Sequence, residues 1–176
     1  MMAVINRIGI VIVYNTVNSN QTSSSNKKEE SEDEGLSTKD IIELIEKISN
    51  LPYEGNEKSM RIIADHLRTA VFISADPAGI KPSNTDQGYI LRRLLRRAIR
   101  HAKKLNIDVN SDFEQQIAKL ILNKYNKYYK ELVDNEQVVL EVLNNEKIKF
   151  NRTLEKGLRE FEKITKTVQG TEIDKD

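Results

Sequence analysis

The sequence predicts an all-α fold, a bundle of about five helices that ends in a long helical hairpin. From residue 38 to residue 168, apolar residues recur at intervals of three and four, which is the period of an amphipathic helix. The three prolines lie between these periodic segments, where a helix has to stop. Residues 18–35 contain no large apolar side chain, so the bundle is expected to begin after them.

Residues 1–35 are predicted to form an N-terminal arm outside the bundle. Ile8–Tyr14 is apolar and β-branched, which indicates one short strand. The segment is too short to cross a membrane, and no cleavage site of small residues follows it. The rest of the arm is rich in Ser, Asn and acidic residues, so we expect it to be disordered. The helical domain is therefore expected to span residues 36–176.

Two helices are expected at the start of this domain. Ser37 or Thr38 can cap the first helix, and Pro52 and Gly55 follow its end. The second helix is expected from about Lys58 to Ser74. The predicted core residues of the two helices are Ile41, Leu44, Ile45, Ile48, Met60, Ile63, Ala64, Leu67, Ala70 and Val71.

Charged residues along one side of the second helix allow two interpretations. Arg61, Asp65 and Arg68 follow one another at i, i+4 and i+7, close enough to pair. Asp65 also precedes His66, as it would in an acid–base site. No nucleophile or metal cluster accompanies them, so we expect a buried ion-pair network that orients the helix.

A strongly basic helix is expected up to about Lys104. Its apolar residues share one stripe: Leu91, Leu94, Leu95, Ala98, Ile99 and Ala102. No acidic residue lies between Asp86 and Asp108. A guanidinium group is permanently charged and planar and can hold two phosphate oxygens, so this helix is predicted to contact RNA or DNA. The alternative that some arginines pair with acids elsewhere stays open. The candidate RNA-binding side chains on this helix are Arg92, Arg93, Arg96, Arg97, Arg100 and Lys103.

The last third of the chain is predicted to be a helical hairpin. Ser111–Glu114 has the pattern of a capping box, and Asp134 and Asn135 are expected to make the turn. The first helix carries Phe113, Ile117, Leu120, Ile121, Tyr125, Tyr128 and Leu132 on one stripe. The second helix has a near-heptad face expected to pack back on the first: Val139, Val142, Leu143, Phe150, Leu154, Leu158, Phe161, Ile164 and Val168. Tyr125, Tyr128 and Tyr129 stand among lysines and could stack on bases, but a position at the edge of the core is expected.

Composition excludes several kinds of site. The 176 residues carry a net charge of +1 and no cysteine, so disulfides and thiolate metal sites are excluded. His66 and His101 lie far apart and in no metal-ligand spacing, so we expect no metal site. The small net charge hides an acidic stretch at residues 29–34 and a basic one at residues 92–104. This segregation favours an anionic partner for one surface.

Three sequence runs identify a family resemblance. RIIADHLRTAVFISAD, KPSN and GYILRRLLRRAIRHAKKL, in this order, resemble the alanyl-tRNA synthetases (alanine–tRNA ligases), and the likeness covers about Leu36 to the C-terminus. The resemblance implies the helical tRNA-recognition middle domain of an enzyme that uses ATP and Mg to attach alanine to its tRNA. It also implies that Asn84 reads a G·U pair in the acceptor-stem minor groove. An amide suits this task because it both donates and accepts hydrogen bonds. A helix cap at Ser83, Asn84 or Thr85 is the alternative.

The sequence departs from the family pattern in two places. The Gly-x-Gly-x-Glu-Arg pattern of the class II catalytic domain does not precede Leu36. We therefore expect no catalytic residue and no cofactor in this chain, which is not expected to be catalytic alone. The family's second reader of the G·U pair, an aspartate in a Leu-Tyr-Asp segment, is also expected to be missing.

These observations predict an acceptor-stem recognition module of an alanine–tRNA ligase. The expected partners are the acceptor stem of tRNA-Ala and the catalytic portion of the parent enzyme, and no membrane. The expected location is the cytoplasm. The alternative is a helical module that binds a protein partner through the long hairpin. Salt separates the two, because RNA binding releases cations and weakens steeply with salt.

Overall fold

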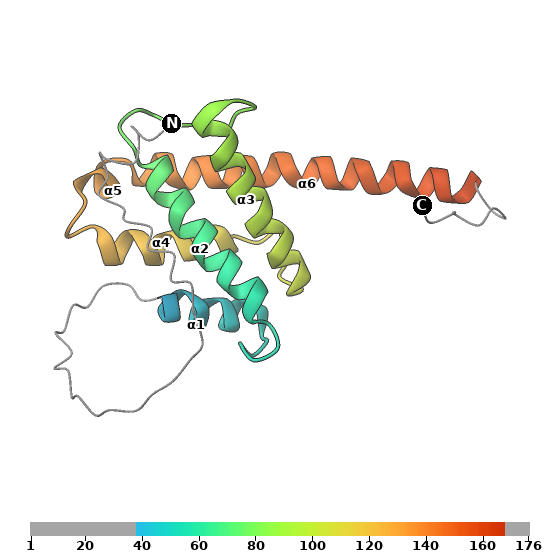
Figure 1. The fold of residues 1–176 in the computed structure, drawn as a ribbon, viewed down its shortest axis with the longest axis horizontal. Coiled ribbons are helices and arrows are strands. Elements are labelled where there is room, and N and C mark those ends of the chain that lie inside the picture. The colour runs from blue at the N-terminus through green and yellow to red at the C-terminus, as the bar shows by residue number, and fades with distance from the viewer. Residues whose placement is uncertain (1–37, 168–176) are drawn as a thin grey trace, which may run out of the picture. The chain divides into compact units, whose positions relative to one another are not determined.

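The computed structural model describes residues 38–167, and all regular structure in this part of the chain is helical. The predicted arm, its strand and the domain boundary at residue 35 lie outside the described residues. Six helices follow in order (Figure 1): α1 (Thr38–Ser49), α2 (Glu57–Ser74), α3 (Asp86–Lys104), α4 (Phe113–Tyr125), α5 (Lys130–Asp134) and α6 (Glu136–Thr167). The all-α fold class is confirmed.

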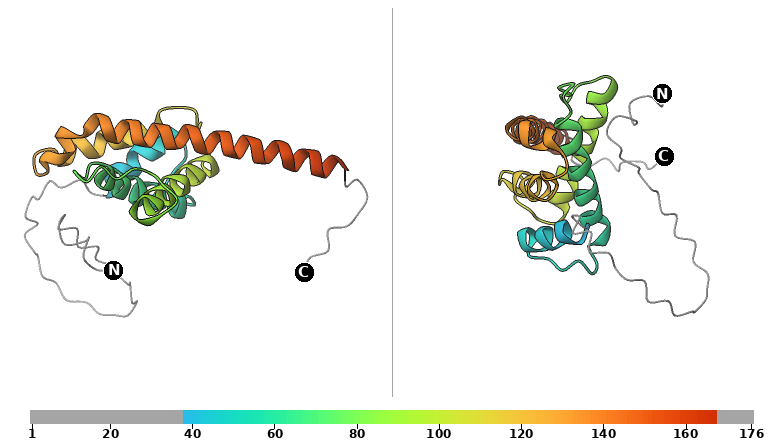
Figure 2. Two further views of the ribbon diagram at one scale, coloured as in Figure 1. Left: turned by 90° about the horizontal axis from the view of Figure 1, so that it is seen from above. Right: turned by 90° about the vertical axis from the view of Figure 1, so that its left-hand side faces the viewer.

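The helices of this unit form two layers. Figure 2 shows α1, α4 and α6 end-on in a column, with α2 running across them. The helix α2 packs against α1, α3, α4 and α6, and its most extensive contact is with α3. The basic helix α3 packs mainly on the central helix α2 and also contacts the long helix α6.

The predicted apolar stripes form the core. All six predicted core residues of α2 are fully buried, and so are Ile41 and Ile45 of α1. In α3, Leu91, Leu95 and Ala98 are buried, whereas Leu94 is only partly covered. From α4 and α6 the buried apolar residues are Phe113, Ile117, Ala118, Ile121, Leu122, Val139, Val142 and Leu143.

The predicted first helix of the hairpin is broken into α4 and α5. The backbone is extended at Tyr129 (φ −128°, ψ 99°), directly before α5. The ring of Tyr129 packs edge-on against Phe72 of α2 at 5.3 Å between centroids, and the ring of Tyr125 does so at 5.2 Å. This aromatic contact with a helix distant in sequence accompanies the break and confirms the core-edge position of Tyr125 and Tyr129. The same prediction is wrong for Tyr128, which is 63% exposed.

Three further local predictions are wrong. Glu114 is buried and pairs with Lys147 of α6 at 2.7 Å instead of closing a capping box. The Asp65 side chain is 69% exposed, so its contact with Arg68 at 3.9 Å belongs to the surface. Arg61 pairs with the hydroxyl of Tyr53 and not with Asp65. In each case a partner from another segment, or solvent, competes with the local pairing.

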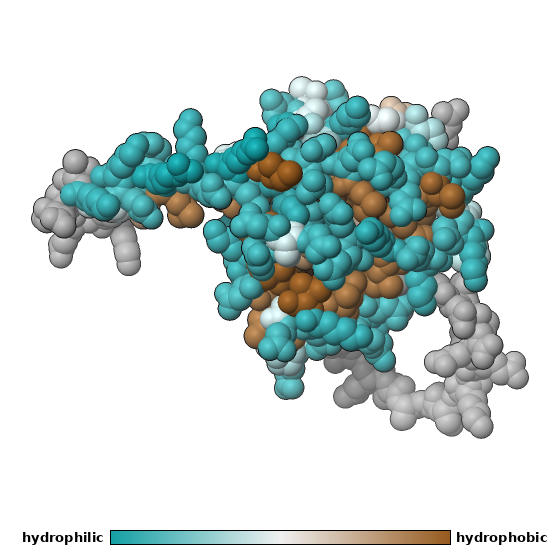
Figure 3. Space-filling model, turned by 180° about the vertical axis from the view of Figure 1, so that it is seen from behind, coloured by the Kyte–Doolittle hydropathy of each residue, from teal (hydrophilic) through white to brown (hydrophobic). Residues whose placement is uncertain are grey.

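The second helix of the hairpin, α6, was predicted to pack along the first one over its whole length, and this prediction is correct only for the first half of α6. Val139, Val142 and Leu143 are buried, but Leu158 and Phe161 are 51% and 62% exposed. Figure 1 shows the second half of α6 extending beyond the other helices of the unit. In Figure 3 this extended part is mostly hydrophilic, with an apolar patch on one side.

Candidate nucleic-acid interface

The basic side chains of α3 fall into two groups because two faces of the helix meet different surroundings. Leu91, Leu95 and Ala98 occupy the face that packs into the core. One flank of this face lies against α6, and the rest of α3 is open to solvent. Arginines of the same helix therefore differ in their partners.

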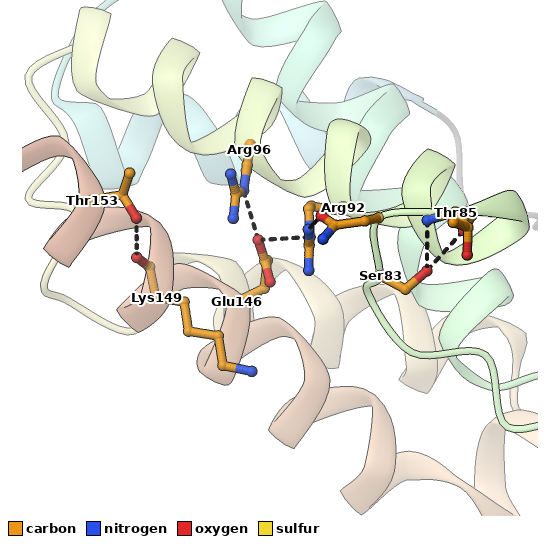
Figure 4. A network of polar contacts seen from close by, with 8 residues as sticks. Ser83, Thr85, Arg92, Arg96, Glu146, Lys149 and Thr153 are labelled. Atoms are coloured by element: carbon orange, nitrogen blue, oxygen red, sulfur yellow. Dashed lines mark hydrogen bonds and ion pairs between the residues drawn. The ribbon is translucent and has the colours of Figure 1, made fainter.

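The first group, Arg92 and Arg96, is tied to Glu146 of α6 (Figure 4). The Nε atom of Arg96 donates to Oε1 of Glu146 at 2.7 Å, and the Nε atom of Arg92 lies 3.8 Å from the same oxygen. Glu146 is only 2% exposed. The guanidinium of Arg96 also lies 5.2 Å from the ring centroid of Phe150, in a cation–π contact. These two arginines thus stabilise the packing of α3 on α6, whatever else they contact.

The second group, Arg93, Arg97, Arg100 and Lys103, is exposed. None of the four forms an ion pair with a described residue, and Arg93 lies over the ring of Tyr89 at 5.7 Å. Arg93, Arg97 and Arg100 follow one another at i, i+4 and i+7, so they share one stripe of the helix. Lys104, which is not in the predicted set, is also exposed and extends this stripe by one turn.

The positive charge of this stripe acts on the neighbouring histidine. His101 is 8% exposed, and its Nδ1 lies 3.1 Å from Oγ of Ser59. Burial lowers the pKa of His101, and the charges of Lys104 and Arg97 lower it further. Burial is the larger of these causes, so the positive potential at this end of α3 follows from the cations themselves, and such a potential suits an anionic ligand.

Asn84 lies in the loop before α3, where the structure connects it to the first group. The Oδ1 atom of Asn84 accepts a hydrogen bond from Nη1 of Arg92, and the residue is otherwise exposed. Thr85 occupies the N-cap position, but no side chain caps the helix. The hydroxyl of Ser83 instead donates to the carbonyl oxygen of Thr85 at 2.7 Å. Asn84 therefore does not serve as a helix cap.

Sequence reasoning missed Glu146, the acid on which this arrangement depends. Glu146 stands fifty residues after Arg96, in a stretch with Lys147 and Lys149 that reads as an exposed helix face. The only signal in the sequence is its place in the helical period, three residues after Leu143. Glu146 thus lies next to the apolar stripe that packs into the core.

Metal sites and membrane spans are both absent from the part of the chain that the structure describes. Residues 38–167 contain no group of three His, Asp or Glu side chains that could hold a metal ion. Among the helices of the same range, none is both long and apolar enough to cross a membrane.

Comparison with known proteins places this arrangement in a family. Residues 20–176 match the family described as tRNA synthetases class II (A). Three similar proteins are each named alanine–tRNA ligase. The one from Treponema pallidum (strain Nichols) is 42% identical over 118 residues, which cover 66% of this chain and 19% of the relative. The one from Borreliella afzelii (strain PKo) is 42% identical over 136 residues, 76% of this chain and 23% of the relative.

The third, from Treponema denticola, is 50% identical over 103 residues, which cover 57% of this chain and 17% of the relative. The chain therefore spans about a fifth of the length of these relatives.

Proposed function

The chain belongs to the alanyl-tRNA synthetase family of class II tRNA synthetases. From this membership we propose that its helical unit binds the acceptor stem of tRNA-Ala. The exposed stripe of α3 contacts phosphates, and Asn84 faces the minor groove. The unit thereby contributes tRNA recognition to the attachment of alanine.

The observation that carries the proposal is the exposed stripe of Arg93, Arg97 and Arg100. Three guanidinium groups stand on one rigid helix, and no acidic side chain of the described residues pairs with them. Arginines without a protein partner are available to a ligand, and each can donate two hydrogen bonds to a phosphate. The stripe begins at Arg93, directly after the Arg92 that contacts Asn84, so phosphate contacts and a base contact start from the same turn of α3.

The test replaces the stripe without touching the ion pairs of α3. We expect Arg93→Gln, Arg97→Gln and Arg100→Gln together to weaken the binding of an acceptor-stem hairpin RNA. The slope of log K against log salt should also fall, by roughly one for each phosphate that the variant no longer neutralises. Fluorescence anisotropy over a salt series measures both quantities, and thermal unfolding should change little because the stripe is exposed.

A matched control removes the same charge elsewhere. Lys119→Gln, Lys124→Gln and Lys127→Gln neutralise three exposed cations in and just after α4. These changes should leave the affinity near that of the unchanged chain. Equal losses in the two triple variants would mean that net charge alone binds RNA, and would overturn the assignment to α3.

A second candidate function rests on a separate observation. Leu158 and Phe161 are large, apolar and more than half exposed on the extended part of α6. Such residues suit a protein partner, including the rest of a longer polypeptide. This contact does not use the basic stripe, so it is compatible with RNA binding.

A further inference from the structure

Glu146 is buried at the meeting point of α3 and α6, where it faces two guanidinium groups. Its Oε1 atom accepts from Arg96 at 2.7 Å and lies 3.8 Å from Nε of Arg92. The Arg92 side chain is 24% exposed, and its Nε forms no hydrogen bond. Arg92 is therefore held beside Glu146 mainly by charge, which leaves the outer nitrogens of its guanidinium for another partner.

That other partner is Asn84 (Figure 4 shows the neighbouring Ser83 and Thr85). A guanidinium has no acceptor, so it can meet an asparagine amide only through the amide oxygen. Contact with Arg92 therefore engages the Oδ1 atom of Asn84 and turns its Nδ2 group away from Arg92. The Nδ2 group of Asn84 forms no hydrogen bond with a described residue and remains for a ligand.

We infer that Glu146 is a positioning residue that acts through Arg92 to present Asn84 to RNA as a hydrogen-bond donor. The inference rests on the proposed function, and it names the chemistry that Asn84 recognises. The ligand group must be an acceptor of the minor groove, such as a pyrimidine O2, a purine N3 or a 2′-hydroxyl oxygen. Discrimination between base pairs then depends on a carboxylate of α6 that is buried and unable to touch the RNA itself.

A purely structural role for Glu146 makes a different prediction, and the chain offers a matched control. Glu114 and Lys147 form a second buried ion pair, 2.7 Å long, between α4 and α6. Glu114 is as buried as Glu146, and its ion-pair partner lies on α6 and not on α3. If Glu146 only joined helices, Glu146→Gln and Glu114→Gln should have the same effect on RNA selectivity, namely none.

The first experiment measures selectivity with the full chain and two hairpin RNAs that differ only in a G·U or G·C pair. Asn84→Ala should reduce the ratio of the two affinities by about fivefold, the equivalent of one neutral hydrogen bond. Glu146→Gln should reduce the ratio in the same direction, and Glu114→Gln should preserve it. Asn84→Asp should also reduce it, since a carboxylate keeps the acceptor but loses the donor. A ratio preserved by Asn84→Asp would overturn the donor assignment.

The second experiment needs no RNA and separates this inference from the proposed function. NMR relaxation of the Asn84 side-chain amide should show an ordered group in the unchanged chain and in Glu114→Gln. The order parameter should fall in Glu146→Gln, and also in Arg92→Lys, which keeps the charge but loses the fork that bridges the two partners. If Glu146→Gln does not fold, Arg92→Lys alone tests whether the contact with Arg92 orders the Asn84 amide.

The combined outcomes are distinct. An Asn84 amide that stays ordered in both variants overturns the inference, even where Asn84→Ala shows that Asn84 reads the base pair. A loss of order in both variants, with no G·U preference in the unchanged chain, supports the positioning by Glu146 and overturns the proposed reading by Asn84.

Discussion

Gly88, in the first turn of α3, lets the loop with Asn84 lie against the start of the helix. Its carbonyl oxygen accepts from the backbone N–H of Ser83 at 3.0 Å. A Cβ atom at this position would lie 2.3 Å from the carbonyl oxygen of Lys81 and 2.4 Å from Oγ of Ser83. The absent side chain is therefore what allows this close approach.

We expect Gly88→Ala to push the loop away from α3. The contact with a backbone oxygen cannot be relieved by a rotamer change, so the free energy of unfolding should fall by about 1–3 kcal/mol. Urea denaturation measures this loss. Gly157→Ala is the control, because its Cβ would meet nothing within 4 Å and it lies inside α6. That change should stabilise the protein by about 0.5–1 kcal/mol, and equal effects of the two substitutions would contradict the packing role of Gly88.

Spacing along the chain predicted most of the buried apolar residues of α3, although Leu94 is only partly covered, but it did not predict which arginines pair. Arg92 and Arg93 are neighbours of the same type, and the helical period places them on different faces without naming what each face meets. The difference comes from Glu146, which the fold brings to Arg92 and Arg96 from another helix. A contact across fifty residues leaves no periodic signal in the sequence.

The helix α6 forms ion pairs with both α3 and α4 through two consecutive residues. Glu146 pairs with arginines of α3, and Lys147 pairs with Glu114 of α4. Residues one apart on a helix point about 100° apart, so one turn of α6 can reach two neighbours. Local pattern assigned Glu114 to a capping box because the sequence contains no sign of its partner in α6.

The Glu114–Lys147 pair makes a prediction about pH. Burial raises the pKa of Glu114 above its ordinary value of 4.5, although the hydrogen bond from Lys147 opposes this change. The folded state therefore binds a proton more tightly than the unfolded state does. The stability gained from this proton is fully present below pH 4.5 and is lost as the pH rises through the folded pKa.

We expect Glu114→Gln to remove this dependence. Urea denaturation between about pH 4 and about pH 7 should show the free energy of unfolding of the unchanged chain falling relative to that of the variant as pH rises. Comparison at each pH cancels the contributions of titrating groups that do not interact with Glu114. If the free energy of unfolding of the unchanged chain instead rose relative to that of the variant, the effect of Lys147 on the pKa of Glu114 would outweigh the effect of burial.

For the described unit as a whole, amphipathic periodicity was sufficient to predict the helices and their buried faces, because burial of one stripe is what forms such a fold. It was not sufficient to predict how far α6 stays packed against the others. The near-heptad pattern continues through Leu154, Leu158 and Phe161, but the other helices end before they can cover it. The spacing of apolar residues shows that one face of a helix is apolar, but it does not show whether another helix of the same chain covers that face.

The two halves of α6 should therefore respond differently to the same kind of substitution. Leu143 is 1% exposed, so Leu143→Ala should lower the free energy of unfolding by about 2–5 kcal/mol. Leu158→Ala with Phe161→Ala removes more apolar surface, yet it should change stability by less than about 0.5 kcal/mol, because both side chains are already exposed. Urea denaturation compares the variants, and sedimentation velocity reports the oligomeric state. A large loss in the double variant, together with a smaller sedimentation coefficient, would mean that a second copy covers this face in solution, and that the extended part of α6 is an interface.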